Sequence, residues 1–373
     1  MNILIVNPFG IGDCLFATPL VHTLKDAFPK SKLGFLCNKR TAPLLRNNPF
    51  INEIFIYERD DFKRLLSVSK LEWLKGFSSF IRQIKKARFD LAIDLSLSSN
   101  FSFFLWLAGI KKRVGYNYKN RGFYLTKSVK LSGYENKHVV EYYNSLLELI
   151  AIKPKYQDLE LYLSDQDKQC AENIFKEHHI DGSTSPTINP ERNRRIDHST
   201  PVIALSAGGG ASWGIEAEIK RWPKEKFASL VNKIIEKYKL TVIIVGDLKE
   251  RDLLLNIETG HQNKVINLAG KTTLAQSAAI INRADLFIGN DGGLLHIAVA
   301  QSKKTISFFG PVDPKIYGPY PPDESRHIVL RKALDCSPCY RKFRLSPCLR
   351  RQECLRSIEV EEALNAISTL LDA

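Results

Sequence analysis

The sequence lacks any run of 18 or more apolar residues, and the segment Leu91–Ile110 is interrupted by serine, aspartate and asparagine. A helix needs about 20 apolar residues to cross a bilayer, so we expect no transmembrane helix. The N-terminus lacks a basic leading region, and Asn7, Pro8 and Gly10 break its apolar run, which argues against a signal peptide. Together these absences predict a cytoplasmic protein.

Acidic residues are scarce relative to basic ones. The chain of 373 residues holds 40 Asp and Glu against 54 Lys and Arg, a formal charge of +14. Such a field attracts nucleic acid, an anionic membrane or a phosphorylated substrate, although a basic surface can also serve solubility alone. None of the standard nucleic-acid-binding modules occurs in the sequence, so we expect no nucleic-acid partner.

Cysteines are few, seven in all, and their spacing excludes the disulfide framework of a small secreted protein. Four of them are close together near the C-terminal end. A structural zinc site is one interpretation, because the first two have a common ligand spacing; buried thiols or an occasional disulfide are the alternatives. The four are Cys336, Cys339, Cys348 and Cys354.

Strand-like and helix-like segments alternate in both halves of the chain, which predicts two doubly wound α/β domains with parallel sheets. Residues 181–200 are polar and rich in Pro, Ser and Asn, as in a linker or insertion. We therefore expect an N-terminal domain over 1–180, a linker over 181–200 and a C-terminal domain over 201–373. Ligands of such sheets bind at the carboxyl ends of the strands, here in the crevice between the two halves.

The first candidate loop follows the strand expected at Asn2–Val6. Gly10 and Gly12 let the backbone approach a ligand at a helix N-terminus. A third glycine is missing, so the loop is not a dinucleotide fingerprint. Asp13 can accept a proton from a hydroxyl, and it can equally be the cap of the following helix.

Two further loops are suited to phosphate. Gly208, Gly209 and Gly210 follow a strand and precede Lys220, so main-chain N–H groups and a cation can hold a diphosphate there. A flexible glycine loop beside a basic helix start is the alternative. The third loop also leads into a helix N-terminus; its residues are Asp291, Gly292, Gly293 and His296. The alternative for His296 is a histidine of the core without a role in binding.

Together these motifs resemble the family 9 glycosyltransferases, the lipopolysaccharide heptosyltransferases. The resemblance covers nearly the whole chain. It rests on NPFGIGDCLFATP, on the glycine loop followed by KRWP, on NLAGKTTLAQSAAIINRADLFIGNDGGLLHIAVA, on FGPVDP and on CSPC. It implies a GT-B fold, with an acceptor-binding N-terminal half and a donor-binding C-terminal half.

The resemblance also implies roles for single residues. The catalytic aspartate of the family falls on Asp13, and its donor-phosphate lysine falls on Lys220. The motif that holds the nucleotide sugar falls on Asp291, Gly293 and His296, and a ribose-contacting acid falls on Glu250. Family members usually have Ser or Thr where this chain has Gly292, which leaves the donor sugar open.

The implied reaction is an inverting transfer of heptose from ADP-heptose, without metal or other cofactor, to an anionic glycolipid at the inner membrane face. The chain has no D-x-D triplet after a strand that would hold a metal. A different nucleotide-sugar donor, or a sugar-nucleotide-binding protein without transferase activity, are the alternatives. A dense basic run is the candidate acceptor side, unless it is only a solvated face; it contains Lys111, Lys112, Arg113, Lys119 and Arg121.

Overall fold

The computed structural model of the chain describes residues 1–155, 157–180, 200–209, 211–251 and 264–371. The contacts divide the chain into two compact units. The first contains 1–162 together with the short segment 341–344, and the second contains 163–340 and 345–373. None of the described helices is long and apolar enough to cross a membrane.

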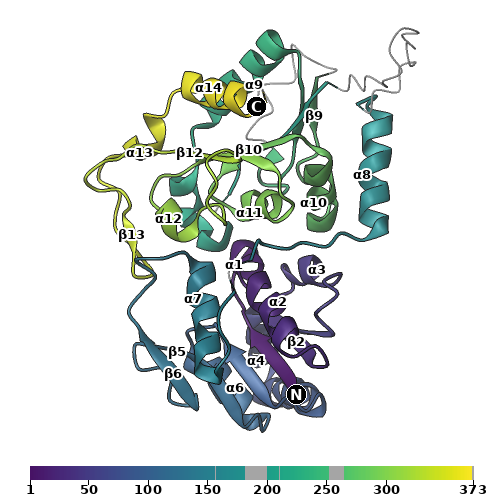
Figure 1. Cartoon of the computed structure of the whole chain (residues 1–373), viewed down its shortest axis with the longest axis vertical. Coiled ribbons are helices and arrows are strands. Elements are labelled where there is room, and N and C mark those ends of the chain that lie inside the picture. Colours follow the sequence, from purple (N-terminus) through teal and green to yellow (C-terminus); the bar gives the residue numbers. More distant parts are fainter. Residues whose placement is uncertain (156, 181–199, 210, 252–263, 372–373) are drawn as a thin grey trace. The chain divides into compact units, whose positions relative to one another are not determined.

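The first unit is built on a six-stranded sheet in the order β3-β2-β1-β4-β5-β6, and all its neighbouring strands are parallel (Figure 1). Its strands are β1 (Asn2–Val6), β2 (Lys32–Cys37), β3 (Glu53–Ile56), β4 (Leu91–Asp94), β5 (Lys112–Tyr118) and β6 (Lys127–Leu131). Its helices are α1 (Ile11–Phe16), α2 (Thr18–Ala27), α3 (Ala42–Leu45), α4 (Arg59–Val68), α5 (Lys70–Lys86), α6 (Ser99–Leu107), α7 (Val139–Ser145) and the 3-10 helix η1 (Leu146–Ile150).

The second unit repeats this plan with the sheet order β12-β11-β10-β7-β8-β9, again parallel throughout. Its strands are β7 (Val202–Ser206), β8 (Thr241–Ile244), β9 (Val265–Asn267), β10 (Leu286–Asn290), β11 (Lys304–Phe308) and β12 (His327–Leu330). The short pair β13 (Tyr340–Arg341) and β14 (Arg344–Leu345) flanks the segment 341–344 that is counted with the first unit. Its helices are α8 (Asp165–Glu177), η2 (Ala211–Lys220), α9 (Lys224–Tyr238), α10 (Leu274–Arg283), α11 (Gly293–Ala300), α12 (Pro314–Tyr317), α13 (Glu353–Arg356) and α14 (Val360–Leu371).

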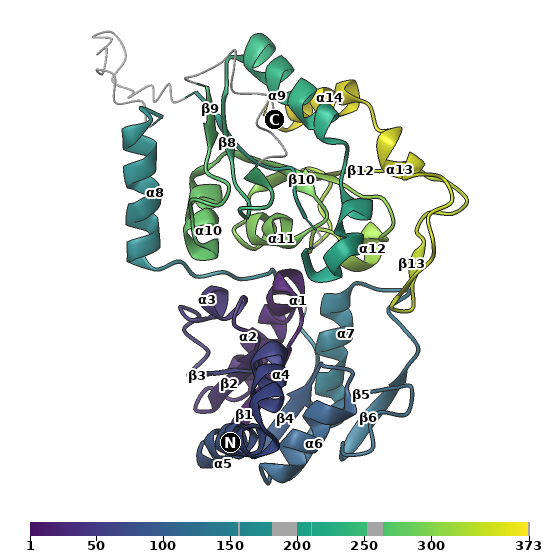
Figure 2. The same ribbon diagram turned by 180° about the vertical axis from the view of Figure 1, so that it is seen from behind.

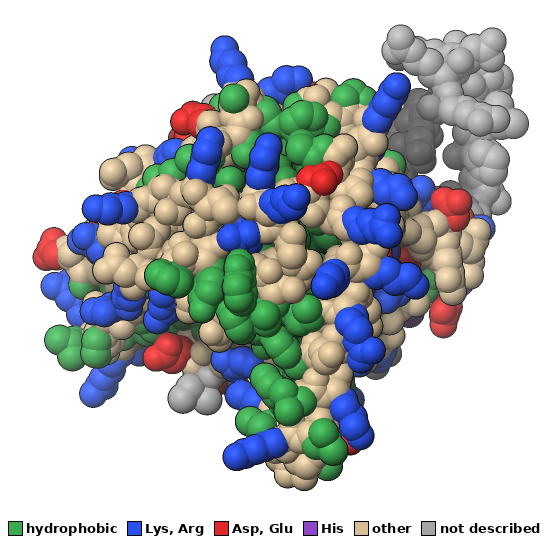
Figure 3. Space-filling view, turned by 90° about the horizontal axis from the view of Figure 1, so that it is seen from below, with side chains coloured by type: hydrophobic (Ala, Val, Ile, Leu, Met, Phe, Trp, Pro, Cys, Tyr) green, Lys and Arg blue, Asp and Glu red, His purple; other side chains and the backbone are tan. Residues whose placement is uncertain are grey.

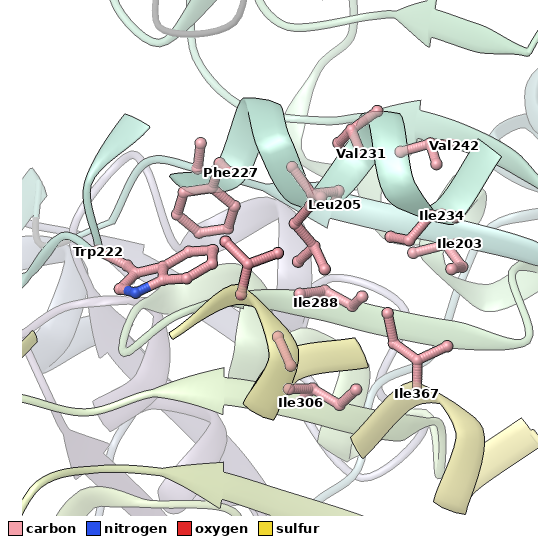
Figure 4. Close-up of a cluster of buried hydrophobic side chains, with 14 of the residues drawn as sticks. Ile203, Leu205, Trp222, Phe227, Val231, Ile234, Val242, Ile288, Ile306 and Ile367 are labelled. Carbon is pink, nitrogen blue, oxygen red and sulfur yellow. The ribbon is translucent and has the colours of Figure 1, made fainter. Parts of the chain in front are cut away.

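The core of the second unit explains why its strands are continuous apolar runs. All five residues of β7 are buried, because helices cover both faces of a parallel sheet. On one face α9 and α14 pack over Leu205, Ile288 and Ile306 (Figure 4). At the end of this cluster Trp222 stacks on Phe308 with ring centroids 4.2 Å apart. The tryptophan therefore anchors the end of η2 to the sheet.

The fold class predicted from the sequence is confirmed, since each unit is a doubly wound parallel sheet in the Rossmann order. The division of the chain differs from the expected one. Helix α8 was assigned to the N-terminal half, but it packs against α10 of the second unit (Figure 2), where Arg283 lies over the ring of Phe175. The expected linker 181–200 lies, apart from Thr200, outside the described residues.

Candidate functional site

Both sheets reverse their strand order at one point, between β1 and β4 in the first unit and between β7 and β10 in the second. At such a point the loops that leave neighbouring strands run to opposite faces, and the gap between them admits a ligand. The loops predicted from the sequence are the ones that leave β1, β7 and β10. The fold therefore places all three at the positions where open α/β sheets bind ligands.

Asp13 lies in the first turn of α1, directly after the loop that leaves β1. Its Oδ2 accepts a hydrogen bond from the backbone N–H of Gly10, the N-cap residue of α1, at 3.2 Å. Its Oδ1 accepts the hydroxyl of Tyr143 at 3.5 Å, and Asn7 donates to its backbone carbonyl at 2.9 Å. Gly12 is half-buried in the same helix. The carboxylate is thus held in one orientation while its side chain stays partly exposed.

A second carboxyl occupies the same sheet edge. Asp94 is the last residue of β4 and pairs in register with Val6 at the end of β1. Burial raises the pKa of Asp94 to about 6, even though the backbone N–H of Ser96 donates to its Oδ1 at 2.9 Å. Asp94 is not among the residues predicted from the sequence, because a strand-end aspartate without a glycine-rich loop belongs to no recognisable motif.

In the second unit Asn290 joins the two candidate loops. Its Oδ1 accepts the backbone N–H of Trp222 at 2.8 Å, and its Nδ2 donates to the carbonyls of Ala207 and Gly208, both at 2.8 Å. Gly209 has φ +129°, a conformation that L side chains rarely adopt. The loop that leaves β7 is therefore fixed by the residue directly before Asp291.

Lys220 and Asp291 form a buried ion pair, with Nζ 2.5 Å from Oδ2 and side chains only 9% and 6% exposed. The ammonium also lies over the ring of Trp213, 4.7 Å from its centroid. An ammonium has three hydrogens, so this pairing holds Lys220 in place and leaves further donor capacity for an anion. Lys220 and Asp291 were both predicted from the sequence as donor-binding residues, whereas Trp213 was not.

His296 is buried on α11, one turn after the helix begins. Burial, and after it the charge of Lys220, lowers the pKa of His296 to about 3, so the imidazole is neutral at physiological pH. The N-cap of α11 is Gly292, in extended backbone, and Gly293 is the first helical residue. Because glycine has no side chain to cap the helix, the first N–H groups of α11 suit an anionic ligand.

Glu250 contacts the glycine-rich loop that leaves β7. It accepts the backbone N–H of Gly209 at 3.0 Å, and burial raises its pKa. A Cβ on Gly208 would lie 1.8 Å from the Glu250 carboxyl group, so only glycine permits this approach. Gly210, also predicted for this loop, lies outside the described residues.

The basic run predicted for the acceptor side divides into two parts. Arg113 donates from Nε to the carbonyl of Tyr124 at 2.6 Å and from its guanidinium to Ile110, so it mainly holds the backbone. Lys119 and Arg121 are exposed and lie over the ring of Tyr118. Lys111 and Lys112 are exposed as well.

The four clustered cysteines do not form a metal site in the part of the chain that the structure describes, where no three potential ligands are grouped. Cys336 and Cys348 are exposed, Cys339 is half-buried and Cys354 is buried. Burial raises the pKa of the Cys354 thiol to about 11, which keeps it protonated. The zinc interpretation therefore has no support from this arrangement.

Comparison with known proteins gives consistent results. The model of glycosyltransferase family 9 (heptosyltransferase) matches residues 77–349. Lipooligosaccharide heptosyltransferase 2 of Haemophilus ducreyi is 26% identical over 344 residues, covering 90% of this chain and 89% of the relative. The ADP-heptose LPS heptosyltransferase II of E. coli has a TM-score of 0.73 at 22% identity, covering 100% and 99%. A family 9 glycosyl transferase from Veillonella parvula has a TM-score of 0.77 at 20% identity, covering 100% and 97%.

Proposed function

Since the chain belongs to glycosyltransferase family 9, we propose that it transfers heptose from ADP-heptose to a hydroxyl of the lipopolysaccharide core or a related glycolipid. The names of the relatives support the donor and the acceptor class. The acceptor would then be used at the cytoplasmic face of the inner membrane.

The observation that carries the proposal is the arrangement around Lys220. A buried cation, a neutral histidine and the start of α11 lie together at the strand-order reversal of the second unit. Fixed donors of this kind stabilise charge that develops on a leaving diphosphate, because they need no rearrangement during the reaction. We assign the ADP moiety to this group, with Glu250 and the loop at Gly208 and Gly209 beside it.

The chemistry is a single displacement at the anomeric carbon. The acceptor oxygen forms a bond to that carbon while the bond to the ADP oxygen breaks, so the configuration inverts. Asp13 takes the proton of the attacking hydroxyl. The electron pair leaves with ADP, whose new charge faces Lys220 and the N–H groups of α11. These groups supply the positive charge that the leaving diphosphate needs, so we propose no metal or other cofactor.

Replacement of Asp13 by asparagine tests the proposal. Asp13→Asn keeps the size of the side chain and one acceptor oxygen, but an NH2 group replaces the other oxygen and the base is lost, so transfer should fall by at least about 100-fold. ADP affinity measured by calorimetry should stay within about twofold, because the base acts on the acceptor alone. Substantial turnover in a folded Asp13→Asn protein would remove Asp13 from the catalytic role.

A panel of ADP- and UDP-sugars tests the donor. A ligand that binds only the folded state raises the unfolding temperature, so ADP-heptose should protect the protein more than the other sugars. Stronger protection by another nucleotide sugar would reassign the donor. Protection by ADP-heptose without transfer to any core acceptor would favour a sugar-nucleotide-binding protein.

A further inference from the structure

The segment 95–134 of the first unit has an extreme charge composition. It contains no aspartate or glutamate in forty residues, but seven lysines and arginines. It forms α6, β5, the connection 119–126 and β6. Because β5 and β6 lie at one side of the sheet, the segment forms one continuous flank of the unit, and all charged side chains of this flank are basic.

Aromatic side chains on this flank touch one another in an unbroken series. Phe77 contacts Phe104, which contacts Phe103; Phe103 contacts both Trp106 and Tyr124, and Tyr124 contacts Phe123. The outer members are exposed, Trp106 to 51% and Phe123 to 84%. We call these six residues the aromatic ridge. Figure 3 shows a patch of hydrophobic side chains flanked by lysine and arginine.

The connection that carries two rings of the ridge is tied to β5 by hydrogen bonds. The connection 119–126 starts at the carboxyl end of β5, where Lys119 and Arg121 lie, and returns to the beginning of that strand. There the N–H of Thr126 donates to the carbonyl of Arg113 at 2.7 Å, and Arg113 Nε donates to the Tyr124 carbonyl at 2.6 Å. The backbone that carries Phe123 and Tyr124 is thus tied to β5.

We propose that the aromatic ridge and the cations of 95–134 dock the first unit on an anionic lipid bilayer. Tryptophan, tyrosine and phenylalanine favour the region between headgroups and acyl chains, and lysine and arginine favour anionic headgroups. Binding at the membrane interface grows with the buried apolar area and with attraction to anionic lipids, and this flank supplies both. The inference deepens the proposed function, because a glycolipid acceptor lies in such a surface.

Charge complementarity favours a bilayer over the other occupants. A second copy of this flank would bring seven cations against seven, and such like-charge contacts are unfavourable. Single-stranded nucleic acid is bound by rings that stack on successive bases. The rings of the aromatic ridge instead pack against each other, and the exposed aliphatic side chain of Leu107 lies on the same helix as Trp106. This arrangement favours lipid over bases.

Vesicle co-sedimentation tests the docking surface. The full chain should sediment with vesicles of phosphatidylcholine and phosphatidylglycerol, and far less with phosphatidylcholine alone or at high salt. Trp106→Ser with Phe123→Ser, and separately Lys111→Glu with Lys112→Glu, should each weaken binding at least about tenfold. The controls are Leu349→Ser, which removes an exposed apolar side chain of the second unit, and Lys176→Glu with Lys237→Glu; both should bind like the wild type.

ADP affinity separates this inference from the proposed function. The Trp106→Ser/Phe123→Ser protein should bind ADP like the wild type, which also shows that it is folded. Vesicle binding that survives both flank variants, or duplex DNA bound in place of vesicles, would overturn the inference. Specific vesicle binding without any transfer from ADP-heptose would support the docking surface and refute the proposed donor.

Discussion

Asp13 bonds to the N-cap residue of a helix, and we also propose it as the base; the sequence presents capping and proton transfer as alternatives. Its two carboxylate oxygens have different partners, the N–H of Gly10 on one and the hydroxyl of Tyr143 on the other. A capping interaction therefore orients the group that we propose as the base. Lys220 likewise has two roles: it forms a buried ion pair with Asp291, and through this pair it lies beside the N-terminus of α11.

Loss of Lys220 should affect both stability and donor binding. Lys220→Ala leaves Asp291 as a buried, uncompensated carboxylate, which costs about 3–5 kcal/mol of unfolding free energy. A lost charge-assisted contact should weaken ADP binding by about 1.5–3 kcal/mol. Urea unfolding and calorimetry measure the two effects, with Lys224→Ala, exposed on α9, as the control. Unchanged ADP affinity in a folded variant would place Lys220 outside the phosphate site.

Asp94 should make stability depend on pH in an unusual direction. Because its folded-state pKa is raised to about 6, the folded protein binds more protons than the unfolded chain between about pH 4 and 6. Stability from this group is therefore present at low pH and lost as pH rises through 6. Asp94→Asn should stabilise the protein at pH 8 by up to about 3 kcal/mol and have little effect at pH 4.

Urea unfolding at the two pH values measures this difference. The exposed Asp90 precedes the same strand, and Asp90→Asn should show no comparable change. Equal effects of Asp94→Asn at both pH values would mean that the carboxyl does not titrate with a raised pKa.

At the scale of elements, the site depends on two loops that leave neighbouring strands of one sheet. Their mutual position rests on Asn290, whose three hydrogen bonds are all buried. Neither the spacing of the glycines nor the charge of the motif indicates this contact. The loops are 83 residues apart in sequence, from Ala207 to Asn290.

Asn290→Ala should therefore impair donor binding without removing any proposed donor ligand. It leaves one N–H and two carbonyls without their partner, which should cost about 2–4 kcal/mol of unfolding free energy. ADP affinity should fall at least about tenfold as the loop at Gly208 loosens. A variant that loses stability but keeps full ADP affinity would show that this contact serves the core alone.

At the scale of the whole molecule, the proposed function gives different tasks to two units with the same sheet order. Asp13 and the basic flank belong to the first, and Lys220, Asp291 and His296 belong to the second. The proposed transfer needs a ligand on each unit, so we expect turnover only when both units are folded.

The metal-free mechanism predicts that full activity survives exhaustive treatment with EDTA. Circular dichroism measured alongside activity distinguishes two ways of failing. Activity lost with the fold intact and restored by magnesium or manganese would refute the mechanism. Parallel loss of fold and activity, restored by zinc alone, would instead make the cysteines at 336–354 a structural site.

Much of this protein follows from local sequence. Buried strands are recognisable in the sequence as apolar runs, and β1 has the predicted bounds, because hydrophobic periodicity and glycine-bounded turns are local signals. Strand β6 gives no apolar signal in the sequence, since it lies at the outer edge of the sheet and four of its five residues are exposed. The family resemblance was confirmed for the same reason, as ordered motifs survive where overall identity is low.

Only the tertiary structure decided which residues meet. The sequence determined that Lys220, Asp291 and His296 exist at suitable spacings, but not that Lys220 pairs with Asp291 or that burial keeps His296 neutral. The sequence does not indicate that Asn290 bonds to the loop that leaves β7, or that the ring of Trp106 stacks on that of Phe103. Such contacts join residues whose separation along the chain is set by sheet order, and sheet order is fixed by the packing of helices on both faces. The pairing of charges and the burial that shifts a pKa are therefore properties of the folded molecule.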